Sequence, residues 1–96
     1  MQLIATVTLN AKEPHAAPPT DLREAEFQAV RGLYMDGFIQ QIWVYADGSG
    51  SSMIVEAPSA AVAADRLGAL PMVRGGYLTA PTVVALAPYW GFGPRS

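Results

Sequence analysis

Hydrophobic and polar positions alternate along residues 2–9, three further short segments are apolar and rich in β-branched or aromatic residues, and in two others apolar positions recur with a helical period. The first four segments predict strands at 2–9, 38–46, 51–57 and 77–86. The helical repeats predict helices at about 20–36 and 59–69. Most Gly and Pro residues fall between these segments, where they separate one element from the next.

Local signals mark where these elements begin and end. Thr20 is the expected N-cap of the first helix, and Gly37 is suited to follow its last turn. Ser59 is the expected N-cap of the second helix, which Pro71 is expected to end. Pro81 has no amide hydrogen to donate, so the strand that contains it is expected at an edge of the sheet.

The order β-α-β-β-α-β predicts an α+β, ferredoxin-like fold, a four-stranded antiparallel sheet with both helices on one face. The 96 residues fit one domain, with 87–96 as an aromatic, turn-rich C-terminal arm. Large apolar groups occupy both faces of the second strand, Trp43 and Tyr45 on one and Ile42 and Val44 on the other. Because no third helix is available, we expect a second copy to cover the free face, giving a homodimer.

Composition excludes several classes of function. Six Lys and Arg are scattered among eight Asp and Glu, for a net charge of -2, which is not the basic footprint of a nucleic-acid-binding protein. The absence of cysteine and the single histidine exclude thiolate and multi-histidine metal sites, and no cofactor is expected. No apolar run approaches the roughly 18 residues of a membrane span, and residues 1–9 lack the features of a signal peptide. We therefore expect a cytoplasmic protein that does not enter membranes.

Three short motifs follow the predicted elements: Gly37-Phe38-Ile39-Gln40-Gln41-Ile42-Trp43, Glu56-Ala57-Pro58-Ser59 and Leu70-Pro71-Met72-Val73. Together they resemble the muconolactone isomerase-like branch of the dimeric α+β barrel proteins, over roughly residues 20–86. The resemblance implies a dimer, or a larger ring of dimers, with a pocket between helices and sheet. Muconolactone isomerase moves a double bond in a small lactone by proton transfer without a cofactor. Relatives on the same barrel include small-molecule cyclases and cofactor-free oxygenases of aromatic polyketides.

The chain departs from that enzyme in two places. Its tail after Ala87 is aromatic, and Gln40 and Gln41 stand in a strand that is more basic in the enzyme. The catalytic residues of the enzyme are therefore not transferred, and candidates are chosen from the pattern of this chain alone.

Glu26 is the first candidate, because it lies about 40° from Leu22 and about 20° from Leu33, inside the apolar arc of the first helix. Glu24, Gln28 and Arg31 are expected on the opposite side. A carboxylate facing a core is costly unless it has a partner, and it is a candidate general base. Arg66 occupies a similar place on the second helix. Since the two helices run antiparallel, a Glu26–Arg66 pair is expected, which either orients an anionic substrate or simply bridges the helices.

Four other side chains are candidates with structural alternatives. His15, in the proline-rich loop after the first strand, could act as the acid partner of a Glu26 base, or could simply be solvated. Tyr34 could contact substrate or only join helix to sheet. Trp43 and Tyr45 could line a pocket, although an aromatic side chain on a strand more often fills a core, here that of the dimer.

These observations favour a small cofactor-independent enzyme for the proton-transfer isomerisation or cyclisation of a lactone-like or polyketide-like molecule. Two alternatives stay open: a non-catalytic ligand-binding or oligomer-forming module of the same fold, and a cofactor-free monooxygenase. A cavity of several hundred Å³ lined by Glu26 would favour the enzyme. A solvent-exposed Glu26, or one fully paired in a closed core, would favour the non-catalytic module.

Overall fold

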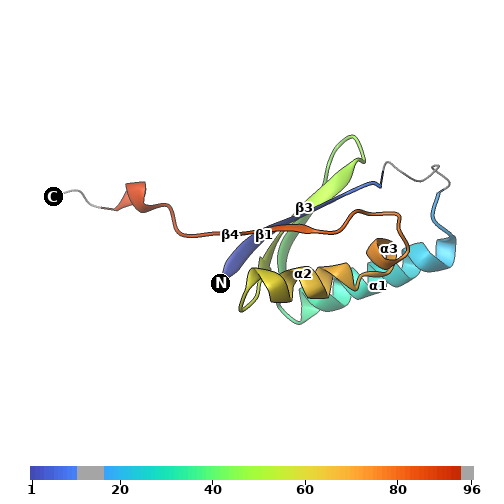
Figure 1. Cartoon of the computed structure of the whole chain (residues 1–96), viewed down its shortest axis with the longest axis horizontal. Coiled ribbons are helices and arrows are strands. Elements are labelled where there is room, and N and C mark those ends of the chain that lie inside the picture. The colour runs from blue at the N-terminus through green and yellow to red at the C-terminus, as the bar shows by residue number, and fades with distance from the viewer. Residues whose placement is uncertain (11–16, 94–96) are drawn as a thin grey trace.

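The computed structural model describes residues 1–10 and 17–93 and has the predicted ferredoxin-like architecture (Figure 1). Four antiparallel strands form one sheet in the order β2-β3-β1-β4. Their bounds are β1 Gln2–Thr8, β2 Ile39–Val44, β3 Gly50–Glu56 and β4 Thr82–Ala85. Three helices, α1 Thr20–Met35, α2 Ala60–Gly68 and α3 Pro71–Arg74, lie on one face of the sheet, and a 3₁₀ turn, η1 Trp90–Phe92, follows β4.

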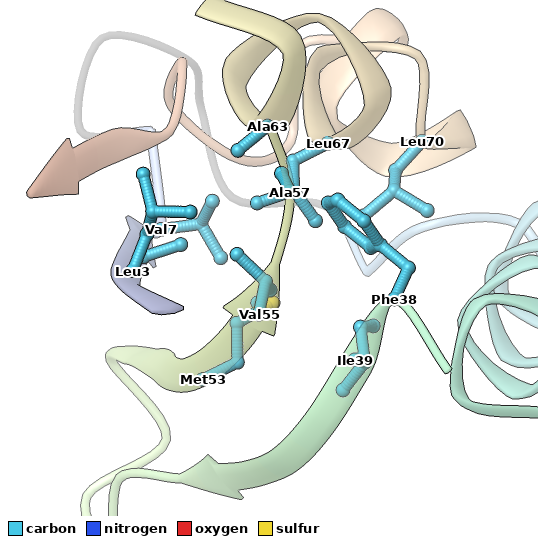
Figure 2. Close-up of a cluster of buried hydrophobic side chains, with 11 residues drawn as sticks. Leu3, Val7, Phe38, Ile39, Met53, Val55, Ala57, Ala63, Leu67 and Leu70 are labelled. Carbon is cyan, nitrogen blue, oxygen red and sulfur yellow. The ribbon is translucent and has the colours of Figure 1, made fainter. Parts of the chain in front are cut away.

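The hydrophobic core lies between the sheet and the helices. Leu3, Ala5 and Val7 alternate along β1 and all point to this side, where they are almost fully buried. Leu67 of α2, and Leu70 after it, meet the sheet residues beside Phe38 (Figure 2). Each buried Leu or Val side chain of this core stabilises the fold by about 1.5–3 kcal/mol.

Helix α1 has the predicted length but a different first residue. Thr20 is its first helical residue rather than its N-cap, because Pro19 occupies the cap position with φ of -55° and ψ of 148°. The other end agrees with the sequence: Asp36 is the C-cap, and Gly37 follows with the positive φ of 88° that glycine accommodates best. The Asp36 carboxylate also accepts a hydrogen bond from the Phe38 amide at 2.9 Å, which fixes the turn into β2.

The connection from β3 to β4 contains one helix more than predicted. Ser59 caps α2 as expected, its hydroxyl accepting a hydrogen bond from the Val62 amide at 3.1 Å. Pro71 does not merely end α2: it stands in the first turn of the short helix α3, where its fixed φ and missing N–H are tolerated. This extra helix lies against α1 and helps to form the candidate site.

Both edge strands are irregular. β4 is at an edge, as predicted, but it starts only after Pro81, and the expected first part of the strand makes an isolated bridge between Leu78 and Leu9. In β2 a bulge between Ile39 and Gln41 adds one residue. Because of this extra residue, Ile39 and Ile42 both lie on the helix side of the sheet.

Substitution of Gly50 should destabilise the fold. A Cβ at this position would overlap the carbonyl oxygen of Val7 and lie 2.9 Å from Cα of Thr8, both of which are backbone atoms. We expect Gly50→Ala to lower the free energy of unfolding by about 1–3 kcal/mol in urea denaturation. Gly32→Ala is the matched control: nothing lies within 4 Å of its Cβ, so it should raise that free energy by about 0.5–1 kcal/mol through helix propensity. Equal effects of the two changes would contradict the steric argument.

Candidate functional site

An open cleft of about 670 Å³ lies between α1 and one end of the sheet. Ile42 and Val44 of β2 form part of its wall, together with Leu9 and Leu78 beyond the ends of the regular strands. Val44 is 74% exposed, because α1 does not cover this corner of the helix-side face. The cleft is mostly apolar and has the size of a small-molecule site.

Glu26 is the buried charged side chain of this cleft. It is 8% exposed and is the most deeply buried residue of α1, so the burial predicted from the helical arc is observed. Its Oε1 accepts a hydrogen bond from the backbone amide of Met72 at 3.0 Å. Met72 lies in the first turn of α3, where amide groups have no partner within the helix. One neutral donor therefore orients the carboxylate.

The expected pair between Glu26 and Arg66 is not formed. Arg66 donates instead to Oδ2 of Asp36 at 2.9 Å, and its guanidinium carbon lies 4.3 Å from the centroid of the Phe38 ring. The physical reason is the length of the helices: α2 ends at Gly68, so Arg66 faces the C-terminal end of α1, and α3 faces Glu26. Arg66 does not line the cleft.

The remaining predicted site residues separate into three groups. Tyr34 lines the cleft and is more than half exposed, at its rim. Trp43 and Tyr45 lie on the other face of the sheet, where Trp43 is 53% exposed and the Tyr45 hydroxyl is 2.6 Å from that of Ser52. The structure therefore does not bring these two side chains to Glu26. His15 lies outside the residues that the structure describes.

Three residues of α1 that the sequence analysis did not select also line the cleft: Arg23, Phe27 and Arg31. They are four residues apart and form one ridge of the helix, with the Arg23 guanidinium carbon 5.9 Å from the centroid of the Phe27 ring. Glu26, Val30 and Tyr34 form the neighbouring ridge with the same spacing. The spacing of four residues within each of the two ridges was visible in the sequence. Arg31 was expected opposite the apolar arc because the pattern does not show that one side of the arc opens onto a cleft.

No metal site is apparent within residues 1–10 and 17–93, since no three His, Asp or Glu side chains of these residues gather closely enough to hold an ion. In the same residues, none of the helices has the length and apolar character needed to cross a membrane. The cytoplasmic location stays a prediction.

The strand order, the helices on one face and the cleft between α1 and the sheet define an α+β protein of the ferredoxin-like class. Among solved structures, the chain is similar to muconolactone isomerase, known from a crystal structure at 3.3 Å resolution. The TM-score is 0.76 at 21% sequence identity, over 100% of this chain and 97% of that chain. The chain thus has a muconolactone isomerase-like fold, as its motifs indicated. No protein-family model matches the sequence, and no curated protein matches it.

The pair between Arg66 and Asp36 predicts a specific dependence of stability on pH. The Phe38 amide, and next the Arg66 guanidinium, hold the pKa of Asp36 below its ordinary value of 3.8. A lowered folded-state pKa contributes stability that is complete above 3.8 and is lost as the pH falls below it. The difference in unfolding free energy between the native chain and Asp36→Asn should therefore shrink on acidification below that value. Urea titrations at several pH values measure it.

Arg66→Met serves as the comparison, because it removes the guanidinium and leaves the Phe38 amide in place. That amide is the larger cause of the lowered pKa. The free energy of unfolding of Arg66→Met should therefore keep most of the dependence on acidic pH that Asp36→Asn loses. If the two variants lost it equally, the guanidinium would be the dominant partner and this account would be wrong.

Proposed function

We propose that this chain is a small cofactor-independent enzyme that isomerises or cyclises a lactone-like or polyketide-like molecule by proton transfer in the cleft. The observation that carries the proposal is the Glu26 carboxylate, buried and hydrogen-bonded in a mostly apolar cleft of about 670 Å³. Its hydrogen-bond partner is a neutral backbone amide rather than a cation. Among the described side chains no Lys or Arg forms an ion pair with Glu26.

Glu26 is the proposed base. It would take a proton from a carbon next to the substrate carbonyl, so that the C–H electron pair moves into an enolate, and return the proton at another carbon. The Met72 amide keeps one carboxylate oxygen in a fixed direction, which favours proton transfer over a short distance. A positioned base of this kind contributes about 10²–10⁴-fold to the rate.

The helix places three polar groups at different distances from that base. Along the axis of α1 each residue rises about 1.5 Å, so Arg23 and Arg31 are displaced from Glu26 by about 4.5 and 7.5 Å along the helix, and Tyr34 by about 12 Å. The arginines are therefore better placed than Tyr34 to stabilise an enolate oxygen near Glu26. Tyr34 would contact the far end of a bound molecule. In this proposal the arginines take the role that the sequence analysis gave to Arg66.

Replacement of Glu26 tests the chemistry. With a β,γ-unsaturated γ-lactone as probe in D₂O, exchange of the α-proton is followed by NMR. Glu26→Gln keeps the shape of the side chain and should slow exchange by at least about 10²-fold, with binding of the probe changed much less. Glu24→Gln is the matched control, because Glu24 is exposed on the same helix and pairs with Gln28.

The outcomes separate the alternatives. Exchange that is equally fast in Glu26→Gln and the native chain would contradict Glu26 as the base. Binding of the probe without exchange by the native chain would favour a non-catalytic binding module.

Self-association is the second part of the proposal. The sheet face opposite the helices is not covered by any described segment, and Ile54, Ile4 and Val84 lie side by side across β3, β1 and β4 on it (Figure 1). Trp43 adds an exposed aromatic ring on β2. A row of apolar side chains on an uncovered sheet face, with an exposed aromatic ring nearby, supports a homodimer that buries this face.

A charge in the middle of this face should prevent the dimer. Val84 is 54% exposed, so Val84→Glu leaves the core intact and places a carboxylate where the second copy would lie. We expect the mass measured by light scattering to fall from that of a dimer to that of a monomer. Met35→Glu, on the exposed end of α1, should keep the dimer mass. An unchanged mass of Val84→Glu would place the interface elsewhere.

A further inference from the structure

The space beside α1 does not end at the cleft that holds Glu26. A second, more open hollow of about 280 Å³ adjoins it and is lined by Tyr34, Gln40, Gln41, Ile42 and Trp43. Tyr34 and Ile42 line both, so the cleft and the second hollow are continuous along the edge strand β2. The second hollow lies towards the C-terminal end of α1, where Tyr34 is displaced from Glu26 by about 12 Å along the helix axis.

The second hollow differs from the cleft in its chemistry. One carboxylate and two guanidinium groups line the cleft, whereas none of the side chains that line the second hollow is charged. Its polar groups are the carboxamides of Gln40 and Gln41 and the hydroxyl of Tyr34. These groups both donate and accept hydrogen bonds, so they suit a ligand group that is polar and uncharged.

The two carboxamides are held differently. Gln40 belongs to the bulge of β2, and its Nε2 donates a hydrogen bond to the Gly37 carbonyl at 2.6 Å, which leaves the carboxamide oxygen as an acceptor for a ligand. Within residues 1–10 and 17–93 no hydrogen bond engages the Gln41 carboxamide. One polar group of the hollow is therefore preorganised, and the other is free to adapt to a ligand.

The backbone of β2 adds a donor and an acceptor beside this hollow. The Tyr45 amide donates to the Gly50 carbonyl at 2.9 Å, and bonded and non-bonded pairs alternate along an antiparallel ladder. Ile42, opposite Met53, is therefore in a non-bonded pair, and its N–H and C=O point to the open edge. No described strand pairs with this side of β2. A polar group that enters the hollow can bond this edge as well.

Trp43 supplies an apolar surface to the same hollow. Its ring is 53% exposed, on the sheet face opposite the helices. Because it stands on the edge strand, it borders the apolar row of the proposed dimer face without being part of it. An aromatic face beside carboxamides suits a flat group with apolar faces and polar edges, such as an amide or a hydroxylated ring.

We propose that the second hollow is a subsite for a neutral, hydrogen-bonding group of the substrate. This inference rests on the proposed function and narrows its substrate class to elongated molecules. The reactive end lies beside Glu26, an apolar middle part lies against Val30 and Ile42, and an end that bears an amide or hydroxyl groups lies over Trp43. A compact lactone would fill the cleft alone.

Binding of tethered lactones tests the subsite. A saturated γ-lactone, which cannot isomerise, is given a tether long enough to span about 12 Å, ending in a carboxamide, a methyl group or a carboxylate. Dissociation constants of the three probes and of the lactone without a tether are measured by calorimetry on the full-length chain. We expect the carboxamide probe to bind about 2- to 10-fold more tightly than the methyl probe, through hydrogen bonds in the second hollow. The carboxylate probe should bind less tightly than the carboxamide probe, because no cation lines that hollow.

Replacement of Gln41 locates the preference. Gln41→Leu removes the free carboxamide and should make the dissociation constants of the carboxamide and methyl probes nearly equal. Gln28→Leu is the matched control, because Gln28 is exposed on α1 and lines neither the cleft nor the second hollow, and it should keep the native ratio. Both positions are exposed, so the fold is expected to persist, which the urea midpoint of each variant verifies.

The ratio of the dissociation constants decides the inference. A preference for the carboxamide probe that Gln41→Leu abolishes and Gln28→Leu keeps supports the subsite. Equal binding of the carboxamide and methyl probes, tightest binding of the carboxylate probe, or a preference that survives Gln41→Leu overturns it.

The same measurements separate this inference from the proposed function. If no lactone binds, with or without a tether, the proposed function fails and the subsite fails with it. If the lactone without a tether binds and the tethers bring no preference, the subsite alone fails. If the predicted preference is found but the native chain exchanges no proton in D₂O, the subsite stands and Glu26 as the base fails.

Discussion

The hydrogen bond from the Met72 amide to Glu26 is the contact on which the candidate site depends. It joins positions 46 apart in sequence and fixes α3 against the middle of α1. A carboxylate that is 8% exposed needs a donor, and the first turn of a helix offers amide groups that have no other partner. Pro71 provides that turn, because it can begin a helix although it cannot continue one. One short helix therefore both accommodates the buried charge and, through Met72, lines the cleft.

The features that followed from local sequence were predicted well. The order of elements depends on periodic patterns, Gly37 on its positive φ and Ser59 on its hydroxyl, and each is a property of a few adjacent residues. The burial of Glu26 followed from its angle within the arc of α1. These predictions needed no knowledge of where the helices lie relative to one another.

The predictions that were wrong or missing concern features that depend on where helices and strands end. Arg66 and Glu26 are both on apolar arcs, but α2 is too short to bring them together, and no pattern in the sequence states that Pro71 begins a new helix. The cleft likewise arises because β2 extends past the cover of α1, so that Val44 faces the helix side and is still exposed. The bulge between Ile39 and Gln41 decides which side chains of β2 reach that side, and its position was not evident from alternation.

Strand β2 connects the two proposals. Only Ile39 of its six residues is buried, and the strand is held on one side by β3 alone. Ile42 and Val44 face the cleft on one side, and Trp43 faces the uncovered sheet surface on the other. A ligand in the cleft and a second copy on the sheet would each bury part of this strand, and each would stabilise the folded chain by mass action. A chain of 96 residues buries a smaller fraction of its surface than a larger domain does, so the edge that forms the site is also the edge that most needs a partner.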